Sequence, residues 1–246
     1  MLTHFPTPIL FAHRGASAYA PENTLASFEL AARQGAPAIE FDVKLTSDRQ
    51  VIIIHDQTLE RTTNGSGIIA SHSLAELREL DAGSWKSPEF RGEKIPLLTD
   101  VLEAVGKKVL INIELTNYAT PFDGLTREVV GLVKQHALQE RIIFSSFYFT
   151  NLLTARRLLP TVPRAQLILE GREGWLQRTT ARFMQLDAEH PYTSDVNVDL
   201  VERVHARGRR VHVWTVNDPA DMRRLRACRV DGIFSDDPLL ALENFK

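Results

Sequence analysis

Short apolar runs alternate with amphipathic stretches along almost the whole chain. The apolar runs predict strands, and the stretches between them, in which apolar residues recur every three to four positions, predict helices. The predicted strands are residues 8–13, 38–43, 109–114, 142–146, 164–169, 183–188, 210–215 and 231–235. The predicted helices are residues 22–34, 98–106, 122–138, 149–159, 173–182, 197–207 and 218–228, with a last short one from 238. Strands that alternate with helices predict an α/β fold with a parallel sheet.

The number of strand–helix units selects the architecture. About eight units in 246 residues favour a closed (β/α)8 TIM barrel over an open doubly wound sheet. They also favour a single domain, residues 1–246, over two smaller ones. Residues 44–97 break the alternation with a hairpin (Val43–Leu45 against Val51–Ile54), a glycine-bearing loop and a helical piece from Ser73 to Leu80. We therefore expect a small folded insertion, about residues 44–97, after the second strand.

The first predicted strand ends in a pair of residues suited to anion chemistry. His13 closes the strand, Arg14 follows it, and a turn at Gly15 leads to a helix after Pro21. The carboxyl ends of strands are where α/β folds collect ligands. We therefore expect the guanidinium of Arg14 to bind a phosphate through two of its nitrogens. The alternative is a salt bridge to Glu40 or Glu22.

Three carboxylates are predicted to meet at the same end of the sheet. Glu40 and Asp42 are two positions apart on the second strand, so both side chains point to one side. Glu114 ends the third strand. Such a cluster repels itself unless a cation lies between its members, and oxygen ligands alone suit Mg²⁺ or Ca²⁺ rather than zinc. A single strand-end carboxylate also fits a salt bridge or a loop cap, but three at matching strand ends favour a metal site.

A second histidine, His55, follows the apolar run 51–54. Taken alone, a histidine in this position fits a structural role. The barrel would bring His55 near His13, across from the carboxylates, and two histidines beside a cation suit complementary proton transfers near neutral pH. Together these groups indicate metal-assisted transfer at a phosphorus centre.

Composition narrows the class of protein. The formal net charge of −2 gives no electrostatic case for nucleic acid or an anionic membrane as partner, and a single cysteine excludes an internal disulfide framework. No apolar run approaches the roughly 20 residues of a membrane-spanning helix, and the first residues do not resemble a signal peptide. We therefore expect a cytoplasmic protein with a small-molecule substrate and no stable membrane insertion; nothing in the pattern indicates its oligomeric state.

An ordered set of motifs between residues 9 and 238 resembles the glycerophosphodiester phosphodiesterases. These motifs are His13–Gly15, Pro21–Thr24, Glu40–Val43, His55–Asp56, Arg61–Gly67, Leu80–Trp85, Ile95–Leu97, Asn112–Glu114, Ser145–Phe147, Val213–Asn217 and Asp231–Ile233. Any one of them is a weak signal, whereas the whole set in this order is highly specific.

The resemblance implies a (β/α)8 barrel with an insertion after the second strand. It also implies hydrolysis of glycerophosphodiesters to sn-glycerol 3-phosphate and an alcohol. The residues that it assigns to one divalent cation, Mg²⁺ or Ca²⁺, are Glu40, Asp42 and Glu114. It makes His13 and His55 the general acid–base pair and Arg14 the phosphate ligand. Phe147 and Trp214 resemble the aromatic residues on the glycerol side of the pocket, ordinary barrel packing being the alternative.

One position departs from the family's pattern. The family usually has a lysine two residues after the third carboxylate, where this chain has Thr116, and Ser235 is a minor change near the last strand. We therefore expect the phosphate to be held by the cation and Arg14 alone, with activity retained and weaker binding. Two alternatives stay open: a lysophospholipase D that acts on lipids with one acyl chain, and a barrel that binds glycerophosphoesters without turnover.

Overall fold

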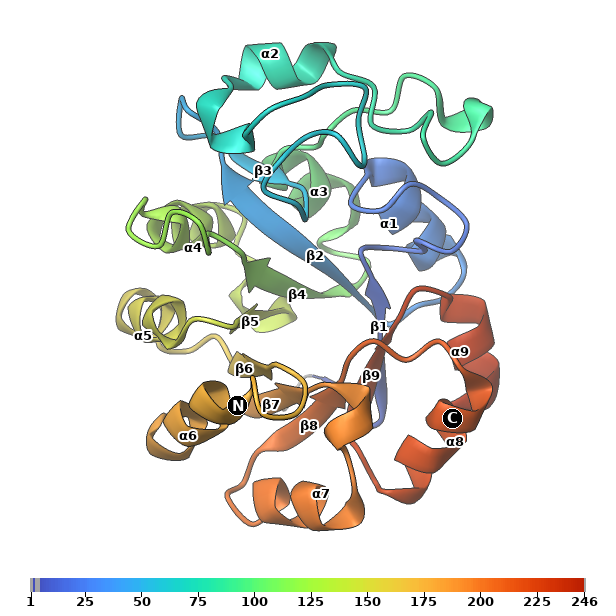
Figure 1. The fold of residues 1–246 in the computed structure, drawn as a ribbon, viewed down its shortest axis with the longest axis vertical. Helices are drawn as coiled ribbons and strands as arrows, with labels where there is room; N and C mark the ends of the chain where they lie inside the picture. The colour runs from blue at the N-terminus through green and yellow to red at the C-terminus, as the bar shows by residue number, and fades with distance from the viewer. Residues whose placement is uncertain (1, 3–4, 246) are drawn as a thin grey trace.

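A closed barrel of parallel strands forms the centre of the computed structural model, which describes residues 2 and 5–245 (Figure 1). Its eight strands are β1 (Ile9–His13), β2 (Ala38–Leu45), β4 (Leu110–Leu115), β5 (Ile142–Ser146), β6 (Arg164–Ile168), β7 (Ala188–Pro191), β8 (Arg210–Val213) and β9 (Gly232–Ser235). The barrel closes at β1, because Phe11 pairs with Ala38 of β2 on one side and with Phe234 of β9 on the other. The predicted (β/α)8 barrel is confirmed.

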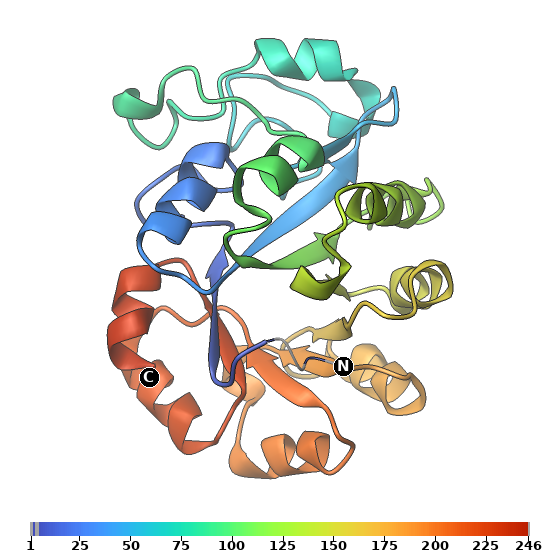
Figure 2. The ribbon, with the colours of Figure 1, turned by 180° about the vertical axis from the view of Figure 1, so that it is seen from behind.

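Helices surround the strands on every side, as Figures 1 and 2 show from opposite directions. They are α1 (Leu25–Arg33), α3 (Leu98–Val105), α4 (Leu125–Gln135), α5 (Phe149–Leu158), α6 (Trp175–Phe183), α7 (Val198–His205), α8 (Pro219–Ala227) and α9 (Pro238–Asn244). Their starts follow from local chemistry: Thr24 forms a capping box at α1, and Asp218 and Asp237 cap α8 and α9 just before a proline.

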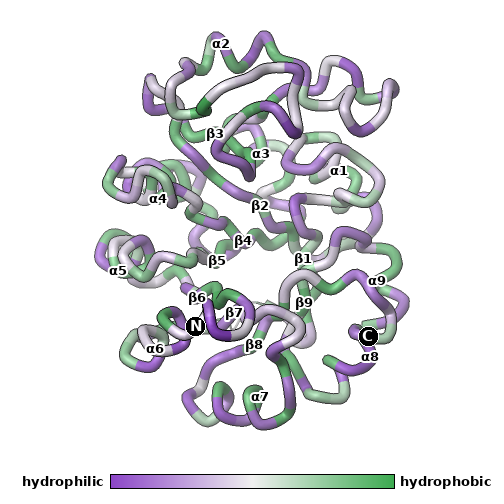
Figure 3. Tube along the Cα trace, in the orientation of Figure 1, coloured by the Kyte–Doolittle hydropathy of each residue, from purple (hydrophilic) through white to green (hydrophobic). Residues whose placement is uncertain are grey.

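Two apolar regions hold the barrel together. The larger lies between the strands and the helices, where one cluster packs α1, α3, α4 and α5 on the strands and another packs α7, α8 and α9. Figure 3 shows green and purple segments alternating along these helices, as expected for helices with one apolar face. The second lies inside the barrel, where Leu2 and Phe5 join Ile9, Ile143 and Ala188. The main-chain oxygen of Phe5 also accepts a hydrogen bond from Arg210 at 2.9 Å. Leu2 and Phe5 therefore pack onto one end of the barrel and leave the other end open for a site.

The segment between β2 and α3 folds on a small apolar cluster of its own. Strand β2 turns back into the antiparallel β3 (Val51–Ile53), and the predicted hairpin is present, with Val43 opposite Ile53. The rest of the segment contains η1 (Ile69–Ser71), α2 (Leu74–Glu79), which confirms the predicted helical piece, and η2 (Pro88–Phe90). The cluster consists of Ile52, Ile54, Leu59, Ile69, Leu77, Ala82 and Ile95.

The predicted strand 183–188 is wrong. The apolar residues that suggested it belong to the end of α6 and the loop after it, where Phe183 is 86% exposed. The strand β7 begins at Ala188 and contains polar residues that are nevertheless buried, because Glu189 pairs with Arg209 at 2.8 Å and His190 faces His212. A polar strand of this kind lacks the apolar signal on which the prediction depends.

No helix in the described part of the chain has both the length and the apolar character needed to cross a membrane. The cytoplasmic location stays a prediction.

Candidate active site

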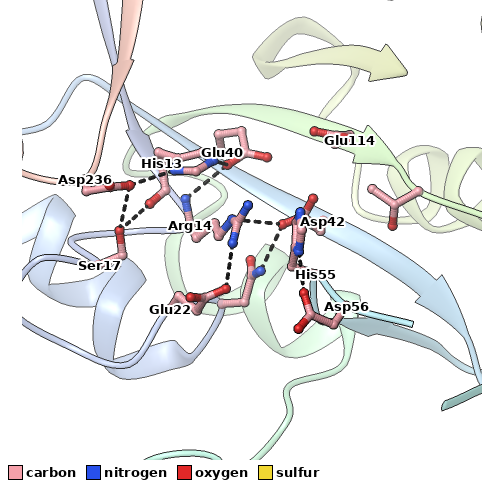
Figure 4. A network of polar contacts seen from close by, with 12 residues as sticks. His13, Arg14, Ser17, Glu22, Glu40, Asp42, His55, Asp56, Glu114 and Asp236 are labelled. Atoms are coloured by element: carbon pink, nitrogen blue, oxygen red, sulfur yellow. Dashed lines mark hydrogen bonds and ion pairs between the residues drawn. The ribbon is translucent and has the colours of Figure 1, made fainter. Parts of the chain in front are cut away.

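The predicted carboxylates converge at the carboxyl ends of β2 and β4. One oxygen from each of Glu40, Asp42 and Glu114 lies within 4.8 Å of the other two. The parallel register explains this, because Asp42 stands directly beside Glu114, and His13 of β1 stands beside Glu40. Figure 4 shows Glu40 and Asp42 both linked to Arg14, with Glu114 on the neighbouring strand. The sequence therefore identified three residues that the fold brings together.

Burial makes this cluster electrostatically strained without a cation. The carboxyls of Glu40 and Asp42 are buried and Glu114 is half-buried. Burial, and then the charge of Asp42, raise the pKa of Glu40 well above its usual value and that of Glu114 to about 8. Burial also acts to raise the pKa of Asp42, but the charges of Arg14 and His55 outweigh it and leave this pKa below its usual value.

The unpaired oxygens of the cluster fit a hard divalent ion. Oε1 of Glu40 and Oδ1 of the neighbouring Asn112 are buried and have no hydrogen-bond partner among the described residues. The available ligand atoms are all oxygens, which suits Mg²⁺ or Ca²⁺. A buried acceptor without a donor is costly, and a bound cation would remove that cost for Glu40.

His13 is held by the carboxylate of Asp236, which was not among the residues predicted from the sequence. Its Nδ1 lies 2.6 Å from Oδ1 of Asp236. Ser17 also donates a hydrogen bond to Oδ1, and Asn217 donates one to Oδ2. Burial acts to raise the pKa of Asp236, but the hydrogen bond from His13 and its charge lower it to about 2. An ionised carboxylate can only accept hydrogen bonds, so the proton between the two groups is carried by Nδ1 of His13. The other ring nitrogen, Nε2, faces Glu40 and lies 4.0 Å from its Oε2.

His55 has the same arrangement on the other side of the site. Its Nδ1 lies 2.6 Å from Oδ1 of Asp56, and Asp56 in turn accepts from Nε of Arg61 at 2.6 Å. The hydrogen bond from Arg61 is the main reason that the pKa of Asp56 lies well below its usual value. Arg61 also pairs with Glu22, and Glu22 with Arg14 at 2.8 Å, so an ion-pair chain links the two halves of the site. Figure 4 shows its Arg14–Glu22 link and the contact between His55 and Asp56.

Arg14 is fixed through both its main chain and its side chain. It has a left-handed backbone (φ 55°) and precedes Gly15, where an added Cβ would lie 2.4 Å from Ser27. Its N–H donates to Oε2 of Glu40 at 3.0 Å, and its guanidinium pairs with Glu22. The alternative of a salt bridge to Glu22 is thus present. Arg14 nevertheless lines the pocket at the cluster, so it is also placed to meet a ligand there.

Phe147 and Trp214 form an aromatic wall of the same pocket, which His13, His55 and Glu114 also line. Their ring centroids are 5.5 Å apart in an edge-to-face contact, and Nε1 of Trp214 donates to the main-chain oxygen of His190 at 2.7 Å. The two rings therefore line the pocket and also pack in the barrel, so both roles considered for them are compatible with the structure.

Three residues of the site were missed from the sequence. Asp236 directly follows β9, so the strand-end carboxylate pattern that identified Glu114 could have found it. The hydroxyl of Tyr118 donates to Oε1 of Glu114 at 2.8 Å, a loop contact that no spacing rule indicates. The ammonium of Lys44 donates to the main-chain oxygen of Thr116 at 3.0 Å and to its hydroxyl at 3.1 Å. Burial lowers the pKa of Lys44, although the charges of Asp42 and Glu114 act to raise it.

Comparisons with known proteins agree with this geometry. Residues 13–240 match the model of the glycerophosphoryl diester phosphodiesterase family. The chain is 37% identical over 232 residues to the glycerophosphodiester phosphodiesterase of Caldanaerobacter subterraneus, with 94% of each chain covered. It is 34% identical to the glycerophosphodiester phosphodiesterase of Bacillus subtilis, over 92% of this chain and 83% of the other.

Solved structures with the same fold include two phosphodiesterases. An Oleispira antarctica phosphodiesterase, solved in complex with its product sn-glycerol-3-phosphate, has a TM-score of 0.84 and 35% identity over 97% of this chain and 96% of the other. The glycerophosphodiester phosphodiesterase of Thermotoga maritima has a TM-score of 0.78 and 27% identity, over 96% of this chain and 97% of the other. This chain is an enzyme that belongs to the glycerophosphodiester phosphodiesterase family of phosphoric diester hydrolases.

Proposed function

We propose that this enzyme hydrolyses glycerophosphodiesters to sn-glycerol 3-phosphate and an alcohol, and that it needs one divalent cation, Mg²⁺ or Ca²⁺. The observation that carries the proposal is the group of three carboxylate oxygens within 4.8 Å of one another, beside a pocket that is lined by two histidines with carboxylate partners. The product bound in the Oleispira antarctica relative supports the choice of substrate.

Glu40, Asp42 and Glu114 would hold the cation. When bound, it would supply a Lewis acid that polarises a phosphoryl oxygen and would neutralise most of the cluster's charge. Arg14, which lines the pocket beside Glu40, pairs with Glu22 through one terminal nitrogen and with Asp42 through Nε at 3.5 Å. Its other terminal nitrogen binds a non-bridging phosphate oxygen.

The two histidines divide the proton transfers. One accepts a proton from the water whose oxygen attacks phosphorus, and the other donates a proton to the alkoxide as the P–O bond breaks. Asp236 and Asp56 hold the rings so that each Nε2 is free for this exchange, and they stabilise the positive charge that the base acquires.

The remaining pocket residues position the substrate. The aromatic wall of Phe147 and Trp214 contacts the carbon atoms of the glycerol moiety, beside the phosphate. His55 comes from the β2–α3 segment and His13 from the barrel, so both parts complete one site. We therefore propose that residues 1–246 act as a single catalytic domain with residues 44–97 as its insertion.

A substrate panel tests the proposed function. Glycerophosphocholine, glycerophosphoethanolamine and a lysophosphatidylcholine would each be incubated with the enzyme in EDTA, Mg²⁺ or Ca²⁺, and released alcohol and sn-glycerol 3-phosphate measured. We expect turnover of the two glycerophosphodiesters in at least one metal and none in EDTA. Faster hydrolysis of the lysophospholipid would favour a lysophospholipase D, and binding without turnover in every condition would favour a non-catalytic barrel.

A further inference from the structure

Lys44 lies on the same face of β2 as the carboxylate cluster. Along this strand, Phe41, Val43 and Leu45 pack in the apolar region between the strands and the helices. Because side chains alternate along a strand, Lys44 points to the opposite side, as Asp42 does. A lysine is thus built into the mouth of the barrel, two positions beyond a carboxylate proposed to bind the cation.

Thr116 fixes the position of this lysine. In the register of β2 and β4, Asp42 is opposite Glu114 and Val43 is opposite Leu115, so Lys44 and Thr116 come next at the rim. The Thr116 hydroxyl donates to the main-chain oxygen of Val43 at 2.8 Å, and it therefore accepts from Lys44. The lysine side chain is held with only 5% of the residue exposed.

The site needs positive charge beyond that of a divalent cation. Two of the three cluster charges would be neutralised by such an ion, and two nitrogens of Arg14 are already paired, one with Glu22 and one with Asp42. An anionic phosphodiester that enters this pocket is repelled by any charge left over, and the interior of a protein screens that repulsion weakly. The buried ammonium of Lys44, two positions beyond Asp42 on the same face of β2, opposes this repulsion.

We propose that Lys44 supplies the positive charge, in addition to the bound metal ion and Arg14, that attracts the phosphodiester anion to this site. Thr116 is the residue that positions Lys44. This inference rests on the proposed function of the same site and identifies a residue that sets its affinity for the phosphate group. It replaces the expectation that the bound cation and Arg14 hold the phosphate alone. A purely structural alternative is that Lys44 only ties β2 to β4.

Charge removal and a residue exchange separate the two roles. The variants are Lys44→Met, Thr116→Lys, the double exchange Lys44→Thr with Thr116→Lys, and the control Lys134→Met. Lys134 is a matched control because its ammonium also donates to a main-chain oxygen, that of Leu158 at 2.9 Å, but on the outside of the barrel. Calorimetry would measure binding of Mg²⁺ and Ca²⁺ to the metal-free protein and of sn-glycerol 3-phosphate to the metal-loaded protein.

Lys44→Met should bind sn-glycerol 3-phosphate at least about ten-fold more weakly, because a nearby charge is lost. It should bind the metal more tightly, because the same charge no longer repels it. In steady-state assays KM should rise more than kcat falls. Thr116→Lys should not improve binding, because its ammonium would face Lys44, whereas the double exchange should regain most of the lost affinity. Lys134→Met should behave as the wild type.

Several results would overturn the proposal. One is a lower melting temperature of Lys44→Met with unchanged affinities for the metal and for sn-glycerol 3-phosphate. This result is expected if Lys44 only connects β2 to β4. Another is tighter phosphate binding in Thr116→Lys alone. If Lys44→Met does not fold, the double exchange Lys44→Thr with Thr116→Lys tests the proposal in its place. A folded double variant that binds sn-glycerol 3-phosphate weakly would contradict the proposal. An inactive wild type would reject the proposed function, while the metal and sn-glycerol 3-phosphate titrations would still judge the role of Lys44.

Discussion

At the residue scale, the two proposed catalytic histidines share one design. Each has Nδ1 at 2.6 Å from a carboxylate, Asp236 for His13 and Asp56 for His55. Such a partner fixes the ring orientation and the position of the proton. The two partners differ in what stabilises them, since Asp56 is backed by Arg61 and Asp236 by hydrogen bonds from Ser17 and Asn217.

The first prediction concerns Asp236. Asp236→Asn should lower kcat on the order of 10²-fold, because the amide no longer holds Nδ1 protonated. The kcat–pH profile should shift as well, which loss of packing alone would not cause. Asp231→Asn is a matched control, since Asp231 also pairs with a histidine, His205 at 2.7 Å, away from the pocket. Equal kcat values in the two variants would contradict the role given to Asp236.

The second prediction separates the acid from the base. His13→Ala and His55→Ala should each lower kcat by about 10²-fold or more on a natural glycerophosphodiester. A nitrophenyl phosphodiester has a leaving group that needs no proton. With this substrate, the variant that lacks the general acid should regain most of the wild-type rate, whereas the variant that lacks the general base should remain slow. Two variants that respond alike to this substrate would show that the histidines do not have separate roles.

Much of the site could be predicted because it follows strand periodicity. Glu40, Asp42 and Glu114 were found from their spacing at strand ends, and the structure confirms that they converge. The lysine Lys44 obeys the same spacing, but a lysine near a strand end is ordinarily a solvated residue, so nothing separated it from the others. Tyr118 reaches Glu114 from a loop, and a loop's path depends on packing that no periodic pattern describes.

At the element scale, β7 explains why one strand was misplaced. A strand that lines the inside of a barrel near a polar site does not need apolar residues. In β7 and β8, His190 and His212 face one another with Nε2 and Nδ1 3.0 Å apart, in contact with Phe11 and Phe234. The hydrophobic pattern therefore pointed to the loop before β7, which contains apolar residues without being a strand.

This histidine pair leads to the third prediction. Burial lowers the pKa of both rings, to about 3 for His212, where the charge of Arg210 adds to the effect. The unfolded chain then binds more protons below about pH 6.5. The contribution of the two neutral rings to the free energy of unfolding is therefore fully present above that pH. It is lost as the pH falls toward 3, by up to about 1.4 kcal/mol per pH unit for each ring.

Urea unfolding at pH 7 and pH 5 would measure this loss. The free energy of unfolding of His212→Gln should fall less between the two pH values than that of the wild type, because one titrating ring is gone. His136→Gln, at the C-cap of the outer helix α4, should keep the wild-type difference. An unchanged difference in His212→Gln would reject the pair as a source of acid sensitivity.

The fourth prediction concerns the β2–α3 segment. Leu77 is 1% exposed in the centre of its apolar cluster, so Leu77→Ala should cost about 2–5 kcal/mol there. We expect faster hydrogen exchange in residues 51–97 than in β4–β9, together with a lower kcat, because His55 follows β3. Leu152→Ala, which removes an equally buried leucine from α5, should leave exchange in residues 51–97 unchanged. Uniform acceleration across the chain in Leu77→Ala would contradict this local effect.

At the scale of the whole molecule, the closed barrel explains how distant residues form one site. His13 and Asp236 are 223 positions apart in the chain, yet β1 and β9 are neighbours because the sheet closes. An open sheet would leave these strands at opposite edges. The count of strand–helix units was enough to predict closure, whereas the contact itself depends on the register between the first and last strands, which the sequence pattern does not specify.

We propose that the three clustered carboxylates bind the cation on which hydrolysis depends. The most direct measurement is calorimetric titration of the metal-free enzyme with Mg²⁺ and Ca²⁺, paired with sn-glycerol 3-phosphate release from glycerophosphocholine. The variants are Glu40→Gln and, as a control, Glu93→Gln, a half-buried carboxyl outside the cluster whose pKa burial also raises. We predict one metal ion per wild-type chain, and loss of both binding and turnover in Glu40→Gln alone. Full turnover in EDTA, or a Glu40→Gln enzyme that still binds metal and works at the wild-type rate, would contradict the claim.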